Sequence, residues 1–213
     1  MNFLAHLWLS DQARLPLAGA ILGDTVRGAL PPDMPEPLAR SVRLHRRVDA
    51  ETDRHPRVAA ARSRFVPGAR RYSGILIDVL FDHVLAQDWR GYSDESLAAF
   101  TDRAAAAVAA EGHWFERAGH APPRAGPFAG LLASYGSESG IELALRRTAG
   151  RLRRPQGMLE AMADWQQHLP ELRRDLPLLL GDLRGLATET GAWVTAHSDS
   201  VPPKSTRPGA AER

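Results

Sequence analysis

The sequence contains no cysteine and a single lysine, Lys204. Without cysteine the chain can form neither disulfides nor thiolate metal sites, so any metal has to be held by imidazole and carboxylate groups. Such nitrogen and oxygen ligands suit Mn²⁺, Mg²⁺, Fe²⁺ or Zn²⁺. The positive charge is carried almost entirely by arginine, which forms bidentate pairs with phosphate and carboxylate groups. A GC-rich genome produces the same bias, so the arginines alone do not establish a phosphate substrate or an acidic partner.

Signals for a membrane or a nucleic-acid partner are also missing. The N-terminal segment is apolar, but no basic region precedes its short apolar run, and polar residues from Ser10 to Arg14 interrupt it. It is therefore predicted to be neither a signal peptide nor a membrane span, and we expect a cytoplasmic protein without membrane contact. No nucleic-acid motif and no basic run with interleaved aromatics occurs, which argues against a nucleic-acid partner.

Alternating patterns long enough to demand a sheet are absent, and the sequence predicts an all-α fold. With 213 residues, of which 44% are hydrophobic, the chain can build one sizeable core. We expect a single-domain helical bundle over residues 1–197 and a disordered tail over residues 198–213. The predicted helices cover residues 2–9, 16–26, 37–54, 57–65, 72–89, 94–118 with Ser93 as its cap, 139–152 with Ser139 in a capping box, and 156–186, which Pro170 and Pro177 should bend or break.

Polar residues inside the most apolar helix are the first functional signal. Between Ile75 and Leu85 the only polar residues are Asp78, Asp82 and His83. A helix that is apolar nearly all round is buried, and carboxylates four residues apart lie on one face of it. Two buried carboxylates repel each other and are costly to desolvate. Either a bound cation or arginine partners would relieve that cost, and the pattern leaves both open.

Similar residues recur in the other N-terminal helices. They are His6 in the first helix, Asp24 and Arg27 at the end of the second, and His45, Asp49 and Asp53 at successive i, i+4 positions of the third. Each has a structural interpretation when taken alone: a hydrogen-bonded core histidine, an ion pair, or a solvated charged face. Together with the apolar helix, however, they place seven candidate ligands within the first 83 residues: His6, Asp24, His45, Asp49, Asp78, Asp82 and His83.

Helical bundles build metal sites from residues that project inward from facing helices. A divalent ion held by histidine and aspartate lowers the pKa of bound water and polarises a phosphoryl oxygen. Arg27, Arg46 and Arg47 are candidates to neutralise phosphate charge as it develops. The pattern therefore predicts metal-dependent hydrolysis of a phosphoester.

Four segments in this order and spacing, MNFLAHL, GAILGDTVRG, LHRRVDAETD and ILIDVLFDHVLAQDW, resemble the acyl carrier protein phosphodiesterases, and the resemblance continues more loosely to about residue 186. It implies an all-helical fold that is distantly similar to the histidine-aspartate phosphohydrolases. It also implies a Mn²⁺-dependent site. The implied reaction hydrolyses the phosphodiester between 4′-phosphopantetheine and a serine of holo-acyl carrier protein, giving apo-carrier and free 4′-phosphopantetheine.

The same resemblance implies roles for individual residues. Asp24 would coordinate metal or water and be the most sensitive position, Arg27 and Arg46 would bind phosphate, and His6 would orient the site. The further metal ligands that it implies are His45, Asp78, Asp82 and His83.

An acidic carrier protein is also a partner that an arginine-rich surface would attract. Candidate contact residues are Arg40, Arg43, Arg62, Arg64, Arg70 and Arg71. Two alternatives stay open at this point: a metal-dependent phosphohydrolase of a nucleotide or another small phosphoester, and a catalytically silent module that binds the carrier. Metal identity, oligomeric state and the cleavage of acylated carriers cannot be predicted from the sequence.

Overall fold

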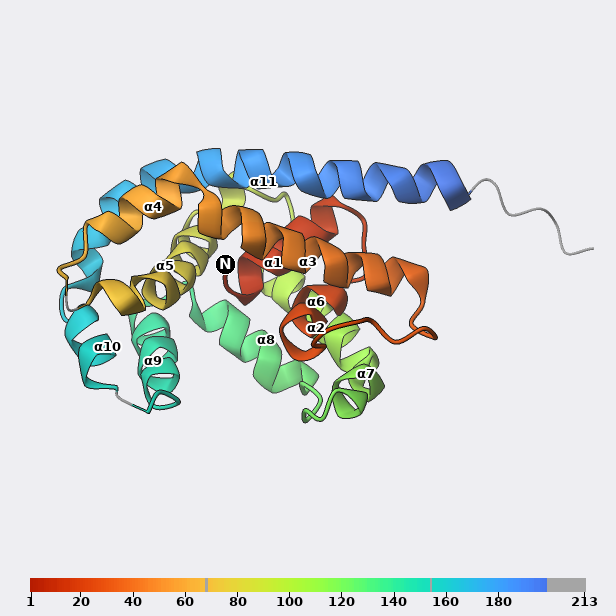
Figure 1. Ribbon diagram of the computed structural model, residues 1–213, viewed down its shortest axis with the longest axis horizontal. Coiled ribbons are helices and arrows are strands. Elements are labelled where there is room, and N and C mark those ends of the chain that lie inside the picture. Colours follow the sequence, from red (N-terminus) through yellow and green to blue (C-terminus); the bar gives the residue numbers. More distant parts are fainter. Residues whose placement is uncertain (68, 154, 199–213) are drawn as a thin grey trace, which may run out of the picture.

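The computed structural model describes residues 1–67, 69–153 and 155–198, and these residues form helices but no strand (Figure 1). In chain order the elements are α1 Phe3–Gln12, α2 Gly19–Thr25, α3 Glu36–Arg54, α4 Pro56–Ser63, η1 Arg70–Tyr72, α5 Ser73–Gln87, η2 Trp89–Gly91, α6 Leu97–Ala110, α7 Gly112–Arg117, α8 Ala125–Ser134, α9 Glu138–Ala149, α10 Gln156–Ala161, η3 Trp165–His168 and α11 Leu169–Ser198. The all-α prediction is confirmed. The predicted tail lies outside the described residues, apart from Ser198. None of the described helices is both long enough and apolar enough to cross a membrane.

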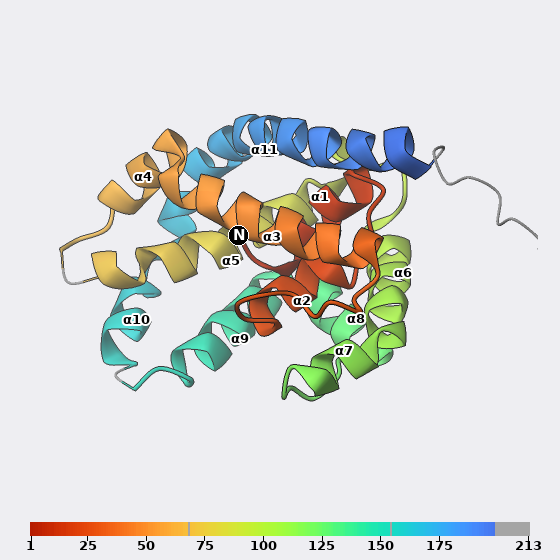
Figure 2. The same ribbon diagram turned by 45° about the vertical axis from the view of Figure 1, so that its right-hand side comes forward.

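Helix α1 lies at the centre of the helical body and contacts α2, α3, α5 and α11. In both views α11 runs along one edge of the molecule beside α3 (Figures 1 and 2). Every residue from Leu4 to Ser10 is buried. A helix covered on all sides must find partners for its polar side chains inside the protein. This central position carries His6 into the interior.

Two glycines allow α2 to pack closely against α3. A Cβ atom on Gly19 would lie 2.3 Å from Cβ of Ser41, and one on Gly23 would lie 2.1 Å from Cδ2 of His45. Both separations are too short for non-bonded atoms. The helices α2 and α3 can therefore pack this closely only because Gly19 and Gly23 have no side chain. The spacing of four residues repeats on both helices, because one turn separates Gly19 from Gly23 and Ser41 from His45.

Several predicted helix boundaries are wrong. The segment predicted as one helix over residues 94–118 forms α6 and α7, which are separated at Glu111. At Gly112, the first residue of α7, a Cβ atom would lie only 3.1 Å from Pro122. The cap of α6 is Ser96, whose Oγ accepts from the Ala99 N–H, while Ser93 Oγ accepts from the Glu95 N–H. In the same way α9 is capped by Ser137. Serine clusters offer several capping positions, and tertiary packing selects among them.

Pro177 does not break the last helix, although the sequence predicted a bend or a break there. The chain breaks earlier, at η3, and α11 starts just before Pro170 and continues through Pro177. The side of α11 that faces the core carries five fully buried leucines: Leu172, Leu176, Leu179, Leu180 and Leu183. Burying one leucine contributes about 1.5–3 kcal/mol. Their sum exceeds the cost of an interior proline, about 3 kcal/mol.

Candidate metal centre

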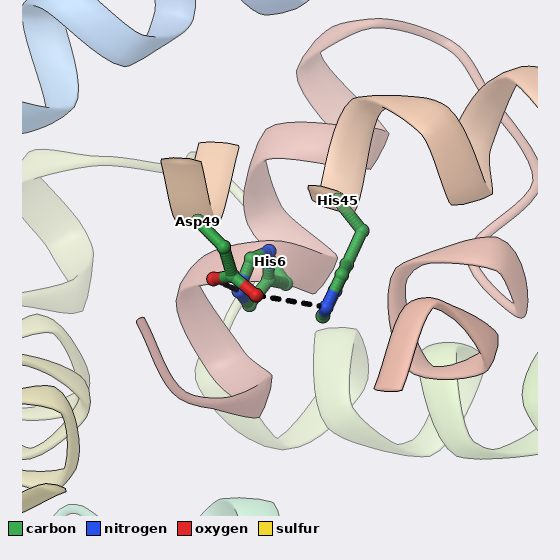
Figure 3. A group of neighbouring side chains, drawn as sticks. All are labelled: His6, His45 and Asp49. Atoms are coloured by element: carbon green, nitrogen blue, oxygen red, sulfur yellow. Dashed lines mark hydrogen bonds and ion pairs between the residues drawn. The ribbon is translucent and has the colours of Figure 1, made fainter. Parts of the chain in front are cut away.

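Two histidines and one aspartate converge where α1 crosses α3. Nε2 of His6 lies 2.9 Å from Oδ1 of Asp49, and Nε2 of His45 lies 3.1 Å from Oδ2 of the same carboxylate. Figure 3 shows the three side chains pointing toward one another, His6 from α1 and the other two from α3. The histidine and carboxylate ligand atoms all lie within 4.8 Å of one another. Both imidazoles are buried, while the Asp49 side chain keeps 39% of its surface exposed.

The orientation of His45 is set by the backbone of α2. Its Nδ1 donates to the carbonyl oxygen of Ala20 at 2.7 Å. This bond leaves Nε2 to face Asp49, and also Asp24, whose Oδ1 is 3.3 Å away. Metal-binding histidines commonly have one ring nitrogen held in this way by a carbonyl. Gly23 makes the arrangement possible, because any larger residue would displace the imidazole.

The two imidazoles are stacked, with centroids 3.9 Å apart and planes inclined by 25°. Burial, together with the nearby charge of His45, lowers the pKa of His6 to about 4. Burial also disfavours the charged form of His45, but hydrogen bonds to Asp24 and Asp49 outweigh it and raise the pKa of His45 to about 9. Burial likewise opposes ionisation of Asp49, yet its bonds to the two histidines hold its pKa below the usual range. The metal-free cluster thus carries a proton on His45.

Asp24 and Asp78 border this cluster and line a cavity of about 310 Å³. Oδ1 of Asp78 is 3.4 Å from the α-amino nitrogen of Met1, which is also 3.3 Å from Oδ1 of Asp49. Burial raises the pKa of Asp78. Asp24 is more open, with 55% of its side chain exposed. Direct contacts thus join two imidazoles and two carboxylates, those of His6, His45, Asp49 and Asp24. The Met1 nitrogen joins Asp78 to this group.

Asp82 has a different environment, although it follows Asp78 by one turn of α5. Its two carboxylate oxygens accept from the backbone N–H groups of Leu4, at 2.7 Å, and Ala5, at 3.0 Å. These N–H groups belong to the first turn of α1 and have no partner within the helix. Burial raises the pKa of Asp82 to about 7 despite these two bonds. The structure therefore uses Asp82 to cap α1, and we leave it out of the proposed ligand set.

The side chains of His83 and of the predicted phosphate-binding arginines have surroundings other than His6 and His45. Nδ1 of His83 donates to the Tyr135 carbonyl at 2.6 Å, and its ring packs edge-on against Trp165. The Arg46 guanidinium donates to the carbonyls of Val26 and Gly28, which holds the loop after α2. Arg27 lines a separate cavity beside Trp114 and Arg117, and exposed Arg47 lies 3.8 Å from Glu189.

The donor set suits a divalent first-row metal. It offers imidazole nitrogen and carboxylate oxygen without sulfur, a combination that binds Mn²⁺, Fe²⁺ or Zn²⁺. Within the part of the chain that the structure describes, His6, His45 and Asp49 are the one group of three or more such residues with donors this close. The fold and the site define an all-helical protein in which two buried histidines and one partly exposed carboxylate form a candidate metal centre.

A model of the family described as acyl carrier protein phosphodiesterase matches residues 1–183. The chain belongs to this family. Proteins named acyl carrier protein phosphodiesterase are similar to it: one from Salmonella agona is 42% identical over 110 residues, 51% of this chain and 57% of its own length, and one from Pectobacterium atrosepticum is 46% identical over 89 residues, 42% of this chain and 46% of its own length. The chain thus spans about half the length of the curated relatives that it matches. No solved structure matches it.

Asp49 and Gly23 have larger roles in this centre than the sequence indicated. Asp49 was placed in the polar constellation, but its i, i+4 relation to His45 is equally typical of a solvated helix face. What distinguishes it is His6, which reaches it from another helix. For Gly23 the four-residue spacing from Gly19 was the available signal, and it could have indicated a close helix crossing.

Proposed function

We propose that this protein hydrolyses the phosphodiester between 4′-phosphopantetheine and the serine of holo-acyl carrier protein, with a divalent metal held by His6, His45 and Asp49. The observation that carries the proposal is the convergence of two buried Nε2 atoms on one carboxylate, in a chain of this family. We propose Mn²⁺ as the metal, as the resemblance implies. A metal bound there would supply a Lewis acid and a more acidic water.

In the proposed reaction a water oxygen forms the new bond to phosphorus as the bond from phosphorus to the serine oxygen breaks. One proton of the water leaves, and the serine oxygen gains a proton. Asp24 is suited to accept the water proton, because its half-exposed carboxylate lines the cavity and lies 3.3 Å from Nε2 of His45. Asp78 lines the same cavity, and burial raises its pKa, so it can hold the proton that the serine oxygen takes up.

The direct test is incubation of the full chain with holo-acyl carrier protein, with and without Mn²⁺. Carrier mass and free 4′-phosphopantetheine are followed by mass spectrometry. We expect metal-dependent conversion to apo-carrier, which a chelator stops. Cleavage of nucleotides or other small phosphoesters with an intact carrier would replace the proposed substrate. Tight carrier binding without turnover under any metal would identify a silent binding module instead.

Metal affinity is expected to rise with pH. Below its pKa of about 9, His45 must lose a proton before Nε2 can bind a metal. Protonation of His45 stabilises the metal-free folded protein, because the pKa of His45 is higher in the folded than in the unfolded chain. This stabilisation is complete at pH values below the pKa of the unfolded chain and is lost as the pH rises through about 9. One proton is therefore released per metal bound, and affinity should increase about tenfold per pH unit between about pH 7 and pH 9. Calorimetric Mn²⁺ titrations at pH 7 and pH 8 measure this slope, and equal affinities would remove His45 from the ligand set.

A further inference from the structure

The cavity beside the metal centre has a second set of charged residues. Its lining includes Asp24 and Asp78, which border the centre, and also Arg147 and Arg151. Arg147 lies in the last turn of α9, and Arg151 lies in the turn that follows this helix. The cavity volume of about 310 Å³ is at the lower end of the range for small-molecule sites, about 300–1,000 Å³.

Both arginines are available to a ligand. Within the described residues neither guanidinium forms a hydrogen bond or an ion pair, and both side chains are exposed. Other arginines are engaged: Arg117, for example, forms two bonds with Asp33. A helix C-terminus favours a nearby arginine by only about 0.3–1 kcal/mol. That effect does not explain why two unpaired guanidiniums share a small cavity with the carboxylates of a metal-type centre.

Tyr135 adds a neutral donor to the same cavity. Its hydroxyl accepts a hydrogen bond from the Asn2 side-chain amide at 3.1 Å, which leaves its own proton free to be donated. Burial raises the pKa of this hydroxyl, so it stays protonated. Two guanidiniums and one hydroxyl are donors that a phosphate group with several oxygens can engage together.

Most of the remaining lining is apolar: Phe3, Ile75, Val79, Leu131 and Ala144, with the methyl-bearing side chain of Thr148. Met1 and Asn2 complete the lining. The hydroxyl of Thr148 donates to the Ala144 carbonyl within α9 and is not available as a donor. Such a wall suits a flexible arm of methyl and methylene groups attached to the phosphate.

From this arrangement we infer that Arg147 and Arg151 bind the phosphate of the phosphopantetheine group, and that the apolar wall holds its pantetheine arm. The identity of this phosphoester rests on the function proposed above. The inference replaces Arg27 and Arg46 as phosphate ligands, because these lie against a different cavity and a backbone loop.

The test measures binding of 4′-phosphopantetheine, of pantetheine without phosphate, and of inorganic phosphate to the Mn²⁺-loaded full chain by calorimetry. The variants are Arg147→Gln, Arg151→Gln and both together. The matched control is Arg146→Gln, since Arg146 is also exposed and is adjacent to Arg147 in sequence but lines another cavity. Each cavity variant should weaken phosphopantetheine binding about 10- to 100-fold. Pantetheine affinity and Mn²⁺ affinity should not change, and the control should bind like the wild type.

The inference fails if both cavity variants bind phosphopantetheine as tightly as the wild type, if the control loses as much, or if the wild type binds neither phosphate compound. Lysine at either position should restore part of the affinity, which separates loss of a phosphate contact from a folding defect. Turnover of holo-acyl carrier protein is measured in parallel. Arginine-dependent binding without turnover would refute the proposed function alone. Turnover that is unaffected in the double variant would refute this inference alone.

Discussion

Asp49→Asn is expected to lower kcat/KM for metal-dependent carrier hydrolysis by about 1,000-fold or more. Both carboxylate oxygens of Asp49 contact imidazole nitrogens, one from His6 and one from His45. Asparagine keeps the shape of the side chain but removes its charge and one acceptor. A bound cation would therefore lose the carboxylate that contacts both histidines. Mn²⁺ affinity, measured by calorimetry, should fall together with activity. The fold should survive, because the side chain is partly exposed.

Asp53→Asn provides the matched control. Asp53 lies one turn further along α3, is exposed, and pairs with Arg62 at 2.6 Å outside the centre. Its replacement should leave Mn²⁺ affinity and turnover within about twofold of the wild type, since exposed ion pairs contribute little. Asp24→Asn belongs in the same series, because the sequence pointed to Asp24 as the most sensitive position. Normal metal binding and turnover in Asp49→Asn would show that the metal is bound elsewhere.

Asp82→Ala is expected to destabilise the metal-free protein by about 3 kcal/mol or more. The substitution removes the acceptors of the Leu4 and Ala5 N–H groups. Both residues are buried, so their N–H groups cannot form hydrogen bonds with water instead. Asp82→Asn keeps one acceptor and should lose less. Equilibrium unfolding in urea at constant pH, with a chelator present, measures the difference directly.

Asp78→Asn tests whether this effect belongs to the cap or to any acid on α5. Asp78 is one turn away and lines the cavity without binding a backbone N–H group. We expect its replacement to lower the unfolding free energy by less than Asp82→Ala does, because the Met1 nitrogen keeps Asp49 as a partner, while it reduces turnover. If Asp82→Ala kept wild-type stability but lost Mn²⁺ affinity, Asp82 would be a metal ligand and not a helix cap.

Most helices could be predicted, because their apolar periodicity is local information. The apolar runs that became α1 and α5 indicated buried helices, and both are buried. The errors concern positions where packing outweighs local preference. Pro177 stays within α11 because the leucines around it are buried in the core, and α6 is capped by Ser96 and not by Ser93, the predicted cap.

The candidate centre was predictable only in part. Helical spacing placed His45 and Asp49 on one face, and the apolar surroundings of His6 predicted that it would be buried. The same reasoning gave Asp82 and His83 equal weight, yet the structure directs them to the backbone of α1 and to Tyr135. His83 points about 100° away from its neighbour Asp82. Asp82 lies on the same face as Asp78, but helical spacing could not show that its carboxylate would meet the backbone of α1.

The sequence by itself determined the fold class, the family and the kind of side chain available to a metal, because absent cysteine, apolar periodicity and the four N-terminal motifs are properties of the chain alone. Only the tertiary structure decided which polar residues meet. His6 and Asp49 are 43 residues apart and come together because α1 crosses α3. Arg147, from α9, which packs against α5, reaches the cavity that Asp24 and Asp78 line. Contacts between distant segments depend on how helices pack, and helix packing is decided by the whole core at once.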